Sequence, residues 1–223
     1  MDGNWRVFTD RRAGGRALAA ELDGYAGRDD VVVLGLPRGG IPVAYEVARA
    51  LGVPLDVFLV RKLGTPWHPE LAMGAIASGG IRVLNEDVVR SYGISPQEIQ
   101  LVAHREQQEL ERRERQYRAG RLLLPVAGRV VILVDDGLAT GSTMRAAVGA
   151  VRQLHPSRVV VAVPVGARES AEELRAVADE VICARTPEPF SAVGQWYIDF
   201  DQTTDEEVQH LLNTSDRAST TQQ

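Results

Sequence analysis

Residues 130–144, VVILVDDGLATGSTM, carry the strongest pattern in the chain. The apolar residues 131–134 predict a buried strand, because a short apolar run in an α/β chain is usually covered by helices on both faces. Two carboxylates, Asp135 and Asp136, follow the strand directly, and the loop after them consists mainly of small and hydroxyl residues. Such a loop, leading into the helical pattern of residues 144–154, can direct several N–H groups and hydroxyls at one point, where the helix N-terminus adds positive charge. The pattern predicts a phosphate-binding site.

The twin acids distinguish this loop from other phosphate-binding loops. It lacks the lysine of the G-x-x-x-x-G-K-[ST] loop and the spacing of the G-x-G-x-x-G fingerprint. Adjacent carboxylates can accept hydrogen bonds from neighbouring ring hydroxyls of a sugar whose exocyclic phosphate is held by the loop. The residues therefore favour a ribose 5-phosphate ligand. The alternative is an acidic strand end followed by a glycine-rich turn that binds nothing.

This stretch, VVILVDDGLATGSTM, resembles the phosphoribosyl pyrophosphate motif of the type I phosphoribosyltransferases. Its sequence is most similar to that of the adenine-type enzymes. The resemblance implies a mostly parallel, doubly wound α/β sheet with a small hood. In that fold the strands ending at residues 34 and 134 are neighbours whose helices leave on opposite faces, which places the ligand crevice at the topological switch point. The resemblance also implies that Asp135 and Asp136 bind the ribose hydroxyls. The 5-phosphate would be held by Ala139, Thr140, Gly141, Ser142 and Thr143.

A second glycine loop, Pro37-Arg38-Gly39-Gly40, follows the strand predicted over residues 31–34 and precedes a predicted helix over residues 41–51. Arg38 supplies a guanidinium group, and the two glycines allow the backbone to approach a ligand closely. Taken alone, the same residues are equally typical of a tight turn between strand and helix. The resemblance implies that they form the pyrophosphate loop, which in this family often has an unusual peptide conformation.

Arg61 and Lys62 follow a strand predicted over residues 55–60. We expect them at the carboxyl end of a neighbouring parallel strand, where open α/β sheets bind ligands, although a solvated strand end is the alternative. The resemblance implies that Lys62, and also Arg61, contacts the pyrophosphate. The segment after them would be a mobile loop that closes over the site; Trp67 is either part of that closure or a packing anchor, and His68 and Glu70 have no assigned role.

The remaining segments surround this centre. Residues 71–84 predict two strands joined by a turn at Gly79-Gly80, and Ser95, Pro96 and Glu98 predict a capping box that opens a helix over residues 95–118. The narrow apolar stripe of that helix predicts that it projects or meets a second subunit; a basic nucleic-acid-binding helix is disfavoured by its interleaved glutamates. Residues 185–212 predict a C-terminal hood or strap, whose aromatic rings either pack or stack on a planar acceptor. Residues 213–223 are expected to form a flexible tail.

The composition is that of one globular domain, predicted over residues 1–212. The chain has 223 residues, of which 44% are hydrophobic and 25% charged, and its net charge of −5 argues against a broad nucleic-acid surface. No apolar run approaches the roughly 20 residues of a membrane span, and the first residues lack a signal-peptide pattern, so a cytoplasmic protein is expected. The single cysteine, Cys183, excludes an intrachain disulfide and is expected to be an inert buried thiol.

The main functional hypothesis is transfer of ribose 5-phosphate from phosphoribosyl pyrophosphate to a nitrogenous base, with release of pyrophosphate. This is the glycosyltransferase reaction of nucleotide salvage. Asp135, Asp136 and Lys62 are the expected catalytic residues, and magnesium is expected on the substrate's pyrophosphate, with no direct protein ligand. The third acid of the 6-oxopurine enzymes falls on Ala139, which disfavours hypoxanthine and guanine and leaves the acceptor open. A homodimer without membrane or nucleic-acid partners is expected. The alternatives are a regulator that binds phosphoribosyl pyrophosphate without turnover and a phosphate-binding partner with an inactive site.

Overall fold

A parallel sheet forms the centre of the molecule. The computed structural model describes residues 7–220, with side chains described as far as Ser215. Five strands lie in the order β2-β1-β6-β7-β8, and each neighbouring pair is parallel. They are β1 (Val31–Gly35), β2 (Leu55–Val57), β6 (Val130–Val134), β7 (Arg158–Val165) and β8 (Glu180–Arg185). Runs of β-branched valine favour these strands, and both β1 and β6 are buried along their whole length. The predicted α/β class with a mostly parallel sheet is confirmed.

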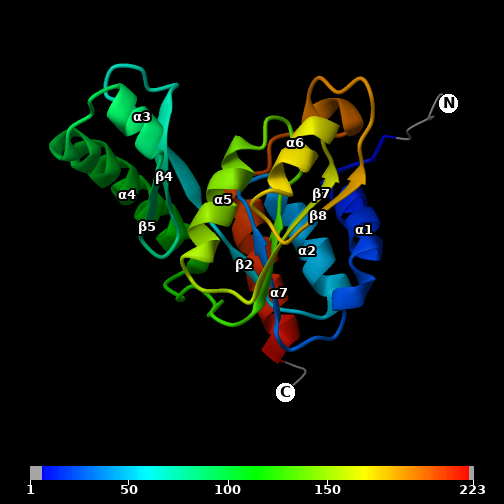
Figure 1. Ribbon diagram of the computed structural model, residues 1–223. Coiled ribbons are helices and arrows are strands. Elements are labelled where there is room, and N and C mark those ends of the chain that lie inside the picture. The colour runs from blue at the N-terminus through cyan, green and yellow to red at the C-terminus, as the bar shows by residue number, and fades with distance from the viewer. Residues whose placement is uncertain (1–6, 221–223) are drawn as a thin grey trace.

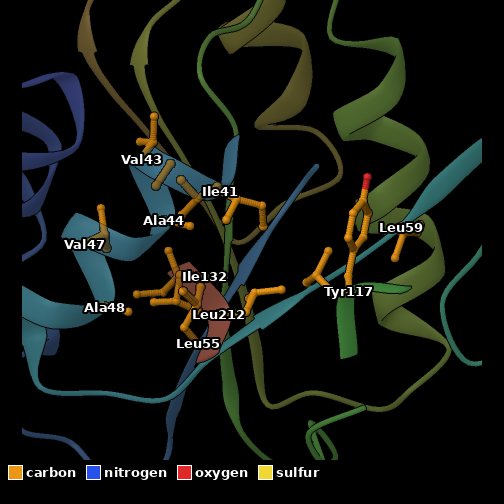
Figure 2. Packing of buried hydrophobic residues seen from close by; sticks show 14 of the residues in the cluster. Ile41, Val43, Ala44, Val47, Ala48, Leu55, Leu59, Tyr117, Ile132 and Leu212 are labelled. Atoms are coloured by element: carbon orange, nitrogen blue, oxygen red, sulfur yellow. The ribbon is translucent and has the colours of Figure 1, made fainter. Parts of the chain in front are cut away.

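Helices cover both faces of this sheet (Figure 1). One face carries α1 (Arg11–Glu21), α2 (Gly40–Leu51) and α7 (Asp205–Thr220), and the other carries α5 (Ser142–Arg152) and α6 (Arg168–Leu174). Alternate residues of β1 divide between the two faces, since Val33 belongs to the core of α2 and Leu34 to the core of α5. Figure 2 shows Leu55, Ile132 and Leu212 grouped beside α2 on the first face.

The ends of β1 and β6 form a topological switch point. The two strands pair in parallel, with Gly35 opposite Val134. The helices that follow them, α2 and α5, pack on opposite faces of the sheet. This arrangement confirms the predicted neighbours and brings together the carboxyl ends of both strands, where sheets of this kind bind ligands.

A smaller lobe stands to one side of the parallel sheet (Figure 1). It contains the antiparallel strands β3 (Val60–Gly64), β4 (Ala72–Ala77) and β5 (Ile81–Leu84) and the helices α3 (Glu86–Ser91) and α4 (Pro96–Arg118). The predicted turn at Gly79-Gly80 and the capping box of Ser95 and Glu98 are both present. The apolar stripe of α4 packs on β3, β4 and α7, so the lobe projects as a unit. No helix among residues 7–220 combines the length and apolarity needed to cross a membrane.

The strand predicted over residues 55–60 is wrong in one respect, because it is two strands in two different sheets. β2 ends at Val57, and β3 begins at Val60 and pairs antiparallel with β4. Between them, Leu59 donates its N–H to Ser78 Oγ at 3.0 Å instead of to a parallel neighbour. Arg61 and Lys62 therefore lie within an antiparallel strand and not at the end of a parallel one. The continuous apolar run of residues 57–60 hides this break from sequence reasoning.

A buried ion pair, which we call the lobe junction, fastens the lobe to the parallel sheet. Arg118, at the end of α4, donates through Nε to Asp56 Oδ1 of β2 at 3.1 Å and through Nη2 to Val57 O at 2.5 Å. Its Nη1 lies 2.7 Å from Glu114 Oε1. Arg118 and Asp56 are 4% and 6% exposed. The other Asp56 oxygen accepts the N–H of Leu124 at 2.9 Å, so both oxygens of this carboxylate are hydrogen-bonded.

The C-terminal part divides into a strap and a helix. The strap, residues 186–204, pairs with the N-terminal segment: Phe8 donates its N–H to Trp196 O, and Ile198 donates its N–H to Phe8 O, both at 2.8 Å. Thr204 Oγ1 then accepts the N–H of Glu207 and caps α7. α7 continues to Thr220, through most of the segment for which the sequence predicts a flexible tail. Residues 221–223, like residues 1–6, lie outside the described part.

Cys183 lies in β8 with its side chain partly buried. Burial raises the pKa of its thiol to about 11. A raised pKa favours the protonated thiol at neutral pH, although the side chain is only partly buried where the sequence predicted a buried one.

Candidate active site

The two glycine loops meet at the switch point. A Cβ atom added to Gly40 would lie 2.9 Å from Asp135 Cα and 3.0 Å from Asp135 Oδ1, and one added to Gly39 would overlap Asp136 Oδ2. The loop between β1 and α2 therefore packs directly against the twin acids, at a separation that only glycine permits. The peptide bond between Pro37 and Arg38 is cis. The unusual peptide conformation that the family resemblance implies is thus present in this loop.

Asp136 is held from three directions. Its Oδ2 accepts a hydrogen bond from Arg11 Nε at 2.8 Å, and its main-chain oxygen accepts one from the Tyr197 hydroxyl at 2.5 Å. Its own N–H donates to Asp135 Oδ1 at 2.9 Å. Sequence reasoning missed both Arg11 and Tyr197. They come from α1 and the strap, far from the acids in sequence, and no local pattern connects them to residue 136.

The two acids differ in their electrostatic surroundings. Burial raises the pKa of Asp135 well above its usual range, and the neighbouring charge of Asp136 raises it further. Burial also raises the pKa of Asp136, but the hydrogen bond and the positive charge of Arg11 oppose that rise. Of the two acids, Asp135 therefore has the more strongly raised pKa.

This asymmetry predicts that Asp135→Asn stabilises the protein at neutral pH. A carboxyl group whose pKa is raised in the folded state stabilises the fold below its unfolded pKa, and that contribution is lost as the pH rises through the folded pKa. Asparagine has no charge to bury, so we expect the free energy of unfolding at pH 7.5 to rise by about 1–2 kcal/mol.

Thermal unfolding of the wild type and Asp135→Asn at pH 4 and pH 7.5 measures this effect. The advantage of the variant should be present at pH 7.5 and shrink at pH 4. An equal difference at both pH values would show that the charge of Asp135 is not its cause.

The predicted phosphate loop is anchored at its start and open at its end. Leu138 donates its N–H to Val165 O at 2.9 Å, and Ser170 Oγ donates to Ala139 O at 2.5 Å. Gly141, with a φ of 72°, precedes α5, and within the described chain no side chain caps that helix N-terminus. The hydroxyls of Thr140 and Ser142, 3.2 Å apart, are exposed. The loop thus combines a helix N-terminus with hydroxyl groups that a phosphate can contact.

Lys62 faces this loop from the smaller lobe. It lines a cavity of about 120 Å³ together with Ser142 and Thr143. Its Nζ lies 3.1 Å from Glu70 Oε2 and 3.2 Å from Glu70 O, which gives Glu70 a position that the sequence did not reveal. The structure therefore brings Lys62 to the edge of the predicted site, although β3 and not a parallel strand carries it.

Arg61 is not brought to the site. Successive residues of a strand point to opposite faces, and Arg61 is turned toward α4, where its Nη2 lies 2.6 Å from Glu106 Oε2. The prediction that both cations lie at the end of a parallel strand is wrong, because Arg61 and Lys62 lie within the antiparallel strand β3 and Arg61 pairs with Glu106. Trp67, in the hairpin loop after β3, is 58% exposed and is not a packing anchor.

Arg38 lies between the glycine loop and α7. Its Nη1 is 3.8 Å from Asp205 Oδ1, and its side chain remains one-third exposed. Asp205 also accepts hydrogen bonds from the Tyr117 hydroxyl at 2.5 Å and from Gln116 Nε2 at 3.2 Å. The guanidinium of Arg38 is thus near the glycine loop, but it also interacts with Asp205, which lies outside that loop.

The strap covers the twin acids with packed aromatic rings. Tyr197 is buried, with its ring centroid 5.6 Å from that of Phe8 and 5.1 Å from that of Phe200. A Cβ atom on Gly137 would overlap Val193 Cγ1, so the strap rests directly on the phosphate loop. Of the two interpretations of these aromatics, the packed strap is the one the structure supports.

Comparisons with known proteins agree with this geometry. Residues 8–200 match the family described as the phosphoribosyl transferase domain. Two Mycobacterium tuberculosis proteins, "Putative phosphoribosyl transferase Rv0571c" of strain H37Rv and "Putative phosphoribosyl transferase MT0597" of strain CDC 1551, are each 48% identical over 212 residues. These alignments cover 95% of this chain and 48% of each relative, so the chain spans about half their length. The crystal structure of TT1426 from Thermus thermophilus has 47% identity and a TM-score of 0.82, covering 92% of this chain and 97% of that one.

Proposed function

Because this chain belongs to the phosphoribosyl transferase domain family, as its resemblance to type I phosphoribosyltransferases predicted, we propose that it transfers ribose 5-phosphate from phosphoribosyl pyrophosphate to a nitrogenous base. The observation that carries the proposal is the position of Asp135 and Asp136, which lie between an open phosphate loop and the Gly39-Gly40 loop. These three features suit the three parts of phosphoribosyl pyrophosphate. The open loop would bind the 5-phosphate, the paired acids the ribose hydroxyls, and the Gly39-Gly40 loop the second anionic group.

The charges fit a displacement at the anomeric carbon. Such a reaction builds positive charge on the ribose ring while negative charge grows on the leaving oxygen, and preorganised groups of opposite sign stabilise both. In our proposal the twin acids bind the ring hydroxyls beside the developing cation. Arg38, Gly39, Gly40 and Lys62 face the departing pyrophosphate, and residues 139–143 hold the 5-phosphate. Arg61 is left out of this assignment because Glu106 engages it.

Magnesium enters the proposal as an ion carried by the substrate. It prefers oxygen ligands and commonly binds through substrate phosphates with one or two carboxylates. In our proposal the ion binds oxygens of the substrate's diphosphate, and the carboxylates of Asp135 and Asp136 remain for the ribose hydroxyls. Bound magnesium would add positive charge at the leaving group, and the protein residues would position the diphosphate that carries it.

The competing function is a regulator that binds phosphoribosyl pyrophosphate without turning it over. Incubation with phosphoribosyl pyrophosphate, magnesium and a panel of purine and pyrimidine bases separates the two. We expect pyrophosphate release that depends on one class of base, with hypoxanthine and guanine poor acceptors because Ala139 carries no carboxylate. Tight binding without release across the whole panel would favour the regulator.

Gly39→Ala is expected to weaken binding of phosphoribosyl pyrophosphate by at least about tenfold. The backbone of Gly39, with φ −60° and ψ −32°, is available to alanine, but the new methyl group would overlap Asp136 Oδ2. Overpacking of this kind typically costs 1–3 kcal/mol, which is about 5- to 150-fold in an equilibrium constant.

Isothermal titration calorimetry with phosphoribosyl pyrophosphate and magnesium measures this loss. Gly24→Ala is the matched control, because no atom lies within 4 Å of a Cβ added there. Equal affinities of Gly39→Ala and Gly24→Ala would contradict the close packing of loop and acid as a requirement for binding.

A further inference from the structure

The Arg11 side chain makes more contacts than a simple surface ion pair would. It is the first residue of α1, and its side chain is only 12% exposed. Besides the bond from Nε to Asp136 Oδ2, its Nη1 donates to Asp201 O at 2.7 Å. Its guanidinium carbon lies 3.9 Å from the centroid of the Phe200 ring. Two separate parts of the chain, the loop of the twin acids and the strap, therefore fix one guanidinium group beside those acids.

These contacts use one oxygen of each acid. Arg11 occupies Asp136 Oδ2, and the N–H of Asp136 occupies Asp135 Oδ1. Both engaged oxygens lie against the glycine loop, because hypothetical Cβ atoms at Gly39 and Gly40 approach those same two atoms. Among the described contacts, Asp135 Oδ2 and Asp136 Oδ1 have no protein partner. One acceptor oxygen on each of two adjacent acids matches two adjacent ring hydroxyls.

We propose that Arg11 is a positioning residue of the ribose site, which fixes Asp136 in one orientation and in its ionised form so that each acid presents one oxygen to the ribose hydroxyls. This inference rests on the proposed function, since it assumes that phosphoribosyl pyrophosphate is the ligand. Arg11 itself contacts no reacting atom in this assignment. It acts through Asp136.

The charge environment of Asp136 indicates what the loss of Arg11 would do. The titratable groups that face Asp136 are Asp135 from its own loop, Arg11 from α1 and Tyr197 from the strap. The facing glycine loop contributes no charge there, because Arg38 reaches toward Asp205. Without Arg11, Asp136 would be a partly buried carboxyl group beside another acid and without the cation that now lies 2.8 Å away, and its pKa would rise.

The test compares Arg11→Gln and Arg11→Lys with a matched control, Arg12→Gln. Arg12 is the next residue of α1, and its guanidinium lies 3.6 Å from Glu46, away from the acids. Two measurements are made: affinity for phosphoribosyl pyrophosphate with magnesium from pH 5.5 to 8.5, and titration of the Asp136 carboxyl carbon by NMR in the ligand-free protein. The second measurement needs no ligand.

For Arg11→Gln we expect affinity at pH 7.5 to fall about 10- to 100-fold, the usual range for a lost charge-assisted hydrogen bond. The pH below which the affinity falls should be higher in Arg11→Gln than in the wild type. The midpoint of the Asp136 titration should move to higher pH with it. Arg11→Lys should restore most of the affinity and the pH below which it falls, whereas Arg12→Gln should match the wild type. In an Asp136→Asn background, Arg11→Gln should cause little further loss, because the two residues act as a unit.

A loss of affinity in Arg11→Gln that is equal at every pH, with an unchanged Asp136 titration, would overturn the inference and leave Arg11 as a packing residue. Failure of the wild type to bind phosphoribosyl pyrophosphate would overturn the proposed function instead. In that case the NMR titration alone decides whether Arg11 sets the ionisation of Asp136. If Arg11→Gln does not fold, Arg11→Met carries the test with the same expected results, because it also removes the charge while its apolar chain can still pack on the Phe200 ring.

Discussion

Simultaneous replacement of Asp135 and Asp136 by asparagine is expected to lower base-dependent pyrophosphate release by about 10²–10³-fold or more, since removal of one preorganised charge-stabilising group typically costs that much. Asparagine keeps the shape of each side chain and removes the negative charge that our proposal places beside the developing ribose cation. The fold should survive. Removal of a buried charge at residue 135 favours the folded state, which offsets the lost ion pair between Arg11 and Asp136.

Turnover and thermal unfolding are measured together on the same preparation of the double variant. The matched control is Glu172→Gln combined with Glu206→Gln, which also removes two charges but from exposed positions on α6 and α7. That control should retain wild-type turnover. Undiminished pyrophosphate release in the Asp135→Asn and Asp136→Asn variant would refute the assignment of the twin acids.

Arg118→Leu is expected to lower the free energy of unfolding by about 3–5 kcal/mol, the usual cost of breaking a buried ion pair by removing one partner. The substitution leaves Asp56 charged and nearly inaccessible to water, with only the N–H groups of Val57 and Leu124 to replace the guanidinium. It also removes the donors to Val57 O and Glu114. Among the described contacts of Asp56, the lobe junction would thus lose its only cation.

Urea denaturation measures this change. Arg115→Leu, three residues earlier on the same helix at an exposed position, should alter stability by less than about 0.5 kcal/mol. Adding Asp56→Asn to Arg118→Leu should recover part of the loss, because the stranded charge is then gone. If Arg118→Leu lowers the free energy of unfolding by less than about 1 kcal/mol, the junction contributes no more than an ordinary surface ion pair and the prediction fails.

The parts of the structure that the sequence predicted are those with local signals. A run of valines predicts β6, the residues after it predict an open loop, and Ser95, Pro96 and Glu98 predict the start of α4, because each pattern is complete within a few neighbouring residues. The adjacency of the two glycine loops followed from the family resemblance, and the paired strand ends confirm it.

The parts that could not be predicted depend on distant residues. The break between β2 and β3 depends on Ser78 and Arg118, which lie 19 and 61 residues from the backbone groups they bind. The error over Arg61 follows from that break. Arg11 reaches Asp136 across 125 residues, and only the folded chain shows that α1 and the strap meet at the acids. The continuation of α7 past residue 212 was missed because the sequence after that residue is polar. The apolar residues that hold the helix in the core, Leu211 and Leu212, come just before it.

The lobe junction has a consequence for the spacing of charges. Lys62 comes from the antiparallel sheet and Asp135 from the parallel one, so the distance between this cation and this acid depends on how the two sheets are joined. Two features join them: the ion pair of Arg118 and Asp56, and the packing of α5 against β3, β4 and β5. Arg118, which lies outside the proposed site, thereby contributes to the distance between Lys62 and Asp135, and through that distance to the size of the molecule that can bind between them.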